Sequence, residues 1–302
     1  MQGFGGVRAS ETQPRSRGMG ESAVMLTLTP AGLHITVARP MGYSDHFGLR
    51  RIAEDQAHAD RLVGALKASG GSLALSWLNL GEYATVTDRE QRLQAERLID
   101  RVLPAVFPLD VAPFEVHRRQ IAAGPHPPHA DEAVAIILTK TIESVIAASG
   151  VEVRLTASGV FDPLNHERLI ASKERLARIT HEKLEGLRKE YATNPDFRRA
   201  VMRADRTPET ASETNVLAIT RAMTATFLPD LKRPITLNDA IDWQHAIVPL
   251  AFCDAVLLDG ATAHAAKQVR RKLPDIPMAL VFTGGGDGID RFIEALAERR
   301  RP

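Results

Sequence analysis

The sequence contains one cysteine, Cys253, and this scarcity excludes a disulfide within the chain and a thiolate metal site. Aromatic residues make up only 5% of the 302 residues, which argues against a single-strand binder that relies on base stacking. No apolar run approaches the roughly 20 residues that a membrane-spanning helix needs. The first residues also lack the continuous apolar stretch of a signal peptide. We therefore expect a cytoplasmic protein with no membrane partner.

The formal net charge is only +1, so the distribution of charge is more informative than its sum. Residues 168–206 contain eleven Lys or Arg and six Asp or Glu, a local charge of +5 that leaves −4 for the rest of the chain. This asymmetry suits an arm that faces phosphates on an otherwise acidic body. A solvated helix with Glu–Lys pairs would have the same composition, and the sequence leaves both interpretations open.

Short apolar segments alternate with helical patterns at both ends of the chain, which is typical of an α/β protein with a parallel sheet flanked by helices. Residues 1–22 are rich in Gly, Arg and Ser and are predicted to be a disordered leader. The α/β domain is predicted from residues 23–123 and 234–302. Between them, residues 124–233 are mostly helical in pattern and are interpreted as a helical insertion.

Individual elements follow from apolar runs, caps and prolines. Strands are expected at 23–29, 33–38, 73–76, 105–110, 254–259 and 277–283. Helices are expected at 45–68, around Glu82, after Asp88, at 111–122, 163–194, 237–252, 260–273 and 287–300. The longest helix should have Asp162 as its cap and Pro163 at its first position, and should end before Pro195.

Acidic residues gather in the segment that leads into the strand at 254–259. Asp239 and Asp242 are three residues apart on one helix, and His245 follows three residues later on the same side. Asp259 ends the apolar strand, at the edge of a parallel sheet where ligands bind. Converging carboxylates repel one another unless a hard cation such as Mg²⁺ or Mn²⁺ neutralises them. Asp residues that cap helices give the same spacing, so the pattern alone does not decide between the two.

Two stretches resemble parts of PIN-like domains, a family of metal-dependent ribonucleases. The C-terminal half of such domains is similar to DAIDWQHA followed by AFCDAVLLDG, in which a helix with Asp-x-x-His leads into a strand that ends in an acid. An earlier match is LALSWLNLGEYATV, a strand followed by a helix that carries Glu82, and the segment 106–116 fits the next strand and helix. Together these matches cover about half of the chain and leave the helical middle unmatched.

The resemblance implies a PIN-like fold and hydrolysis of RNA phosphodiester bonds with Mg²⁺ or Mn²⁺. It assigns catalysis to Glu82, Asp242 and Asp259, with Asp239 as a further metal ligand or outer acid. RNA would be the substrate, and an antitoxin or a second copy of the chain would be the protein partner, as in toxin–antitoxin systems. One departure is that the first runs have Thr27 and Thr29 where such domains carry an Asp after strand one; Asp45 is the nearest acid.

Other interpretations remain open. A PIN-like protein that has lost catalysis could act in nucleic-acid or protein binding. The turn at 284–288 follows a strand and opens a helix, as phosphate loops do, but it lacks the G-x-G-x-x-G spacing, and a flexible turn is the favoured interpretation. His126 and His129 form an incomplete metal pair in a Pro-rich linker. His245 and Trp243 are interpreted as packed core residues rather than as a base and a stacking platform.

Overall fold

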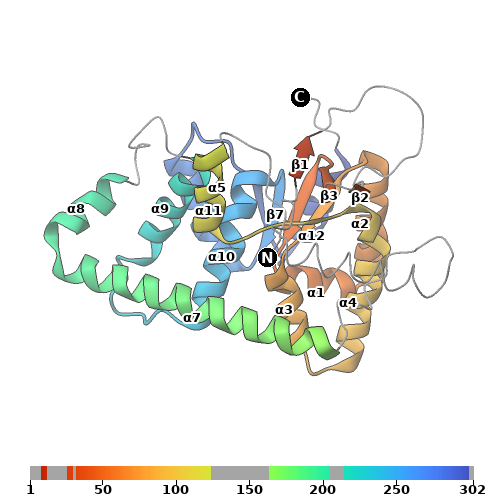
Figure 1. The fold of residues 1–302 in the computed structure, drawn as a ribbon, viewed down its shortest axis with the longest axis horizontal. Helices are drawn as coiled ribbons and strands as arrows, with labels where there is room; N and C mark the ends of the chain where they lie inside the picture. Colours follow the sequence, from red (N-terminus) through yellow and green to blue (C-terminus); the bar gives the residue numbers. More distant parts are fainter. Residues whose placement is uncertain (1–7, 12–25, 30–31, 124–162, 205–213, 299–302) are drawn as a thin grey trace.

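The fold is α/β, with a five-stranded, all-parallel sheet that is flanked by helices (Figure 1). It is given by a computed structural model that describes residues 8–11, 26–29, 32–123, 163–204 and 214–298. The predicted architecture of a parallel sheet covered by helices is confirmed at this level. No helix within these ranges is both long and apolar enough to cross a membrane.

The strands of the main sheet lie in the order β6-β5-β4-β7-β8, which places β4 at the centre. Their bounds are β4 Met41–Ser44, β5 Ser72–Leu75, β6 Val106–Pro108, β7 Ala255–Leu258 and β8 Leu280–Thr283. Every neighbouring pair is parallel, and β4 pairs with the distant β7 through Gly42–Ala255 and Ser44–Leu257. Residues that directly follow these strands therefore meet at one edge of the sheet.

Helices cover both faces of the sheet, since each strand alternates its side chains between two apolar clusters. In β5, Leu73 and Leu75 pack on one face with α1, α2, α4 and α12, while Ala74 packs on the other face with α5, α9, α10 and α11. The helices before the middle segment are α1 His46–Glu54, α2 Gln56–Ser69, α3 Trp77–Thr85, α4 Arg89–Val102 and α5 Pro113–Ala123. The later ones are α10 Leu237–Phe252, α11 Gly260–Lys272 and α12 Gly288–Ala297.

Caps determine where several of these helices begin. The single helix that was expected at 45–68 is divided at Asp55, whose side chain accepts hydrogen bonds from the first turn of α2 at Ala57 N (2.9 Å) and His58 N (3.2 Å). At the other end of α2, Gly70 adopts the left-handed conformation with φ 66°, as a helix C-terminus favours. Asp88 caps α4, as predicted.

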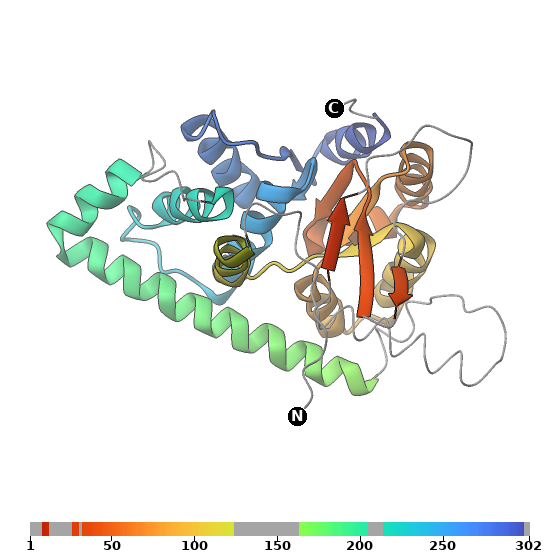
Figure 2. The same cartoon turned by 45° about the horizontal axis from the view of Figure 1, so that its top comes forward.

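The described part of the predicted insertion is helical and packs on the main sheet. It contains α7 Pro163–Thr193, α8 Pro195–Ala204 and α9 Asn215–Phe227. The first helix begins at Pro163 and ends before Pro195, as predicted, while Asp162 lies outside the described residues. It is the long green helix in Figures 1 and 2, and it packs against α3 and α10. Leu184 of α7 and Ile219 of α9 share one apolar cluster with Phe107 of β6, so these helices complete the core.

The first strand of the parallel sheet is β4, and this corrects an expectation. Two of the strands predicted near the N-terminus, β2 Leu26–Thr29 and β3 Gly32–Val37, form a separate sheet with β1 Arg8–Glu11, which lies inside the predicted leader (Figure 2). The order in this sheet is β1-β3-β2. The sequence concealed β4 because it has only four residues and contains Gly42, which is a poor strand former. Tertiary packing explains that glycine, since a Cβ there would lie 2.7 Å from Leu296 of α12.

Candidate active site

Two acidic side chains lie side by side at the carboxyl edge of the sheet. Asp45 directly follows β4 and Asp259 directly follows β7, and these two strands are neighbours. The backbone N–H of Asp259 donates to Asp45 Oδ2 at 2.6 Å, while Asp45 Oδ1 accepts from Gly48 N at 2.8 Å. Asp259 Oδ1 caps α11 by accepting from Ala261 N at 2.9 Å. The two acids are therefore fixed by the strand pairing and by the helices that begin after them.

Two further carboxylates come from helices that cross this edge, Glu82 from α3 and Asp242 from α10. Burial raises the pKa of Asp242, and together with the nearby carboxylates of Asp259, Glu82 and Asp45, and against the opposing effect of His245, it brings that pKa to about 7. Burial also raises the pKa of Asp45 to about 6, although its hydrogen bond from Gly48 opposes the shift. The four acids thus form one electrostatically coupled group, and their mutual repulsion favours a cation.

A buried hydrogen-bond chain holds Glu82 in this group. Glu82 Oε2 is 2.9 Å from His245 Nε2, and the other ring nitrogen of His245 is hydrogen-bonded to the hydroxyl of Tyr43. That hydroxyl is 3.2 Å from Ser76 Oγ, which donates to Asn79 Oδ1 at 2.9 Å. The chain links β4, α3 and α10, so the position of Glu82 depends on all three elements.

His245 is the charged partner of Glu82 in this chain. Burial disfavours the imidazolium, but the Glu82 carboxylate outweighs that effect and raises the pKa of His245. Conversely, burial opposes ionisation of Glu82, and the attraction of His245 nevertheless lowers the pKa of Glu82. The two shifts are consistent with an ion pair in which Glu82 carries the negative charge. His245 is indeed a packed residue, with 1% of its surface exposed, and it also positions the carboxylate.

We expect His245→Ala to destabilise the protein by about 3 kcal/mol, because it leaves the mostly buried Glu82 carboxylate and the Tyr43 hydroxyl without their partner. Tyr43→Phe, which removes only the hydroxyl, should cost about 1 kcal/mol. Chemical denaturation of both variants measures the difference. A His245→Ala protein that unfolds within about 0.5 kcal/mol of wild type would contradict a buried ion pair.

Whether these residues fit a divalent cation depends on their free oxygens. Asp259 Oδ2 is buried and has no hydrogen-bond partner, which is costly unless something compensates for it. Asp45 uses both oxygens for backbone hydrogen bonds and Glu82 uses Oε2 for His245, so the free hard oxygens that Mg²⁺ and Mn²⁺ prefer come chiefly from Asp242 and Asp259. In the described ranges, however, no three His, Cys, Asp or Glu side chains are gathered as a ready-made metal cage. Mg²⁺ is usually held by one or two carboxylates and several waters, so the donor set fits that mode of binding.

The structure gives Asp45 and Asp239 surroundings that the sequence did not suggest. Asp45 is not well past the first strand but follows β4 directly, and it belongs to the acidic group. Asp239 instead forms a capping box at the start of α10, where its Oδ2 accepts from Thr236 N and Thr236 Oγ1, both at 2.7 Å. Its other oxygen is paired with Arg233. Asp239 is thus engaged in the cap of α10 and in the ion pair with Arg233, and its role as a metal ligand stays a prediction.

The remaining sequence candidates have structural explanations or lie outside the described part of the chain. Asp287 lies within the turn at 284–288, at the N-cap position of α12, and its side chain makes no cap hydrogen bond. Trp243 is buried in the core beside Phe114, as predicted. Cys253 is buried at the junction of α10 and β7, and burial raises the pKa of its thiol. The predicted metal pair of His126 and His129 falls outside the described residues.

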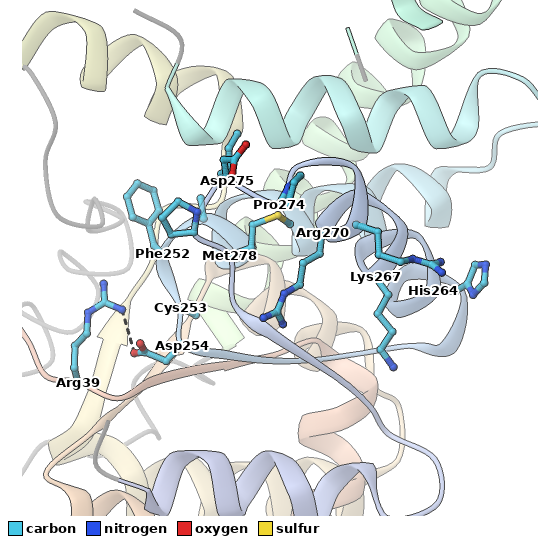
Figure 3. A pocket seen from close by; sticks show the side chains of 14 residues that line it. Arg39, Phe252, Cys253, Asp254, His264, Lys267, Arg270, Pro274, Asp275 and Met278 are labelled. Carbon is cyan, nitrogen blue, oxygen red and sulfur yellow. Dashed lines mark hydrogen bonds and ion pairs between the residues drawn. The ribbon is translucent and has the colours of Figure 1, made fainter. Parts of the chain in front are cut away.

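A large open groove lies at the opposite edge of the sheet from the acids. It has a volume of about 1120 Å³, and Figure 3 shows Arg39, Lys267 and Arg270 around it. Arg39 forms an ion pair with Asp254, which precedes β7, at 3.0 Å. The middle and the basic end of α11 line this groove, whereas Asp259 lies at the opposite end of the same helix. The size of the groove therefore says nothing about the acidic site.

No family model, no curated protein and no solved structure matches this chain. We therefore infer its function from the geometry of the site.

Proposed function

We propose that this protein is a metal-dependent endonuclease that hydrolyses RNA phosphodiester bonds with a PIN-like site. The observation that carries the proposal is the coupled group of Asp45, Glu82, Asp242 and Asp259 at the carboxyl edge of a parallel sheet. These residues are far apart in the sequence, and bringing four acids together is unfavourable without a cation. Ligands commonly bind at this edge of such sheets.

Asp45 supports the resemblance to PIN-like domains where the sequence departed from it. Such domains place an Asp after their first strand, and Asp45 follows β4, the first strand of the parallel sheet along the chain. Asp259 and Asp242 would hold the divalent ion, with Asp45 and Glu82 beside them. A bound Mg²⁺ or Mn²⁺ would orient a water molecule and stabilise charge on the phosphoryl group. The chain itself supplies the fixed positions of the acids through the hydrogen bonds to Asp45, Asp259 and Glu82.

The test compares cleavage of labelled RNA in Mn²⁺ and in chelator by wild type and by Asp242→Asn. We expect wild type to cleave only with metal and the variant to lose about 100-fold or more of that activity. The matched control is Asp275→Asn, which removes an exposed carboxylate beside the remote groove. Equal loss in both variants would contradict a role of the acidic group.

The second candidate function is binding without catalysis, and the observation that favours it is the absence of a preformed three-ligand metal cage among the described residues. Wild type that binds RNA with or without metal, and cleaves none, would support this candidate over the nuclease. An antitoxin or a second copy of the chain as protein partner remains part of the proposal.

A further inference from the structure

Phe47 is an exposed aromatic ring on the helix that begins directly after Asp45. It lies in the first turn of α1, two residues after Asp45, and 41% of its surface is exposed. The neighbouring residues Gly48 and Leu49 are buried, so the helix packs tightly while this ring faces outwards. A single exposed apolar side chain is ordinary in itself. Phe47 differs from such a side chain in its position after Asp45 and in the groups that surround its ring.

Two cationic side chains flank the ring. The guanidinium carbon of Arg50 lies 5.7 Å from the centre of the Phe47 ring, and that of Arg51 lies 5.6 Å from it. Arg50 also approaches Glu54, with 3.5 Å between Nε and Oε1. Among the described residues Arg51 has no ion-pair partner, which leaves its charge available for a ligand. Proteins combine an aromatic ring with a free guanidinium group to hold a base and a phosphate of an unpaired strand.

The glycine turn after β8 supports the ring and leaves space around it. A Cβ at Gly284 would lie 3.0 Å from Cε1 of Phe47. The backbone can approach the edge of the ring this closely because glycine has no side chain. A Cβ at Gly285 or Gly286 would meet nothing within 4 Å, so the turn opens onto free space. Because β8 is parallel to β7, this turn lies at the same edge of the sheet as Asp259. The turn at 284–288 therefore touches Phe47 at the same edge of the sheet as the acidic group.

We propose that Phe47 and Arg51 form a subsite that binds one unpaired base, and the phosphate next to it, of a single-stranded nucleic acid whose backbone reaches the acidic group. The inference rests on the proposed nuclease function and specifies its substrate as single-stranded. A base in a duplex is already stacked on both faces, whereas an unpaired base is free to stack on the ring. The low aromatic content of the chain agrees with a subsite for one base rather than an extended stacking surface.

Binding of a short fluorescent single-stranded RNA, measured by anisotropy in chelator, tests the subsite without requiring cleavage. We expect Phe47→Ala to weaken binding roughly ten-fold, the effect of losing one stacked base, and Phe47→Trp to bind about as well as wild type. Phe114→Ala is the matched control, because Phe114 is 45% exposed and carries Lys183 over its ring at 4.7 Å but lies on α5. That variant should bind RNA like wild type.

An RNA of the same length without bases separates stacking from charge. Wild type and Phe47→Ala should bind this strand equally, while Arg51→Ala should weaken binding of both strands. The inference is overturned if Phe47→Ala binds the normal RNA like wild type, or if its loss is the same on the baseless strand. If wild type never cleaves RNA but its binding still depends on Phe47, the nuclease function is rejected and the subsite is retained. The failure of the proposed function can therefore be distinguished from the failure of the subsite.

Discussion

Asp45→Asn is expected to abolish metal-dependent RNA cleavage, with a loss of about 100-fold or more, whereas Asp239→Asn should remain within about three-fold of wild type. Both oxygens of Asp45 accept backbone hydrogen bonds, from Gly48 N and from Asp259 N. An asparagine keeps only one acceptor, so its amide nitrogen would face a second N–H donor. The substitution thus removes a charge from the acidic group and also disturbs the backbone that positions Asp259.

The comparison with Asp239 makes this experiment specific, since both residues are buried acids at a helix N-terminus. Asparagine can still cap α10 from position 239, and the lost ion pair with Arg233 should lower stability by about 1 kcal/mol. Initial cleavage rates at saturating Mn²⁺, together with a denaturation curve for each variant, provide the measurement. If Asp45→Asn cleaves like wild type, or if both variants lose activity equally, our assignment of these two acids is wrong.

Asp242→Asn is expected to stabilise the metal-free protein at pH 8 and to have an effect about a third as large at pH 5. The pKa of Asp242 is raised to about 7 by burial and by Asp259, while an unfolded chain has an Asp pKa of about 3.9. Between these two pKa values the native state retains a proton that the unfolded state has lost. The contribution of Asp242 to the free energy of unfolding is therefore fully present below pH 4. It is lost as the pH rises through 7. Asparagine imitates the protonated acid at every pH.

The full pKa shift of Asp242 corresponds to about 4 kcal/mol in the free energy of unfolding. Because Asp242 is partly accessible to water, we expect a stabilisation of only about 1–2 kcal/mol. Asp45, with a pKa of about 6, weakens the metal-free protein in the same direction over a lower pH range. Mn²⁺ should raise the melting temperature of wild type more at pH 8 than at pH 5, and this difference should shrink in Asp242→Asn. Thermal melts at both pH values measure these effects, with Asp275→Asn as the control. An Asp242→Asn protein that melts below metal-free wild type at pH 8 would contradict the prediction.

The sequence by itself determined most of the helices and the class of fold, because caps, prolines and apolar periodicity act over a few residues. Thr236 and Asp239 mark the start of α10, and Pro195 separates α7 from α8, in the printed sequence as in the structure. Asp242 and Asp259 could be picked out from the sequence as candidate site residues, since Asp242 lies on a helix of clear period and Asp259 ends an apolar strand.

Only the tertiary structure decided which acids meet. Asp45 entered the site because the short strand β4 pairs between β5 and β7, and four residues with a central glycine give too weak a local signal to predict that pairing. Asp239 is held at the start of α10 by Thr236 and Arg233, which the spacing from Asp242 alone does not reveal. Local hydrogen bonds and periodicity specify elements, whereas strand order and helix packing place side chains from distant parts of the chain within electrostatic reach of each other.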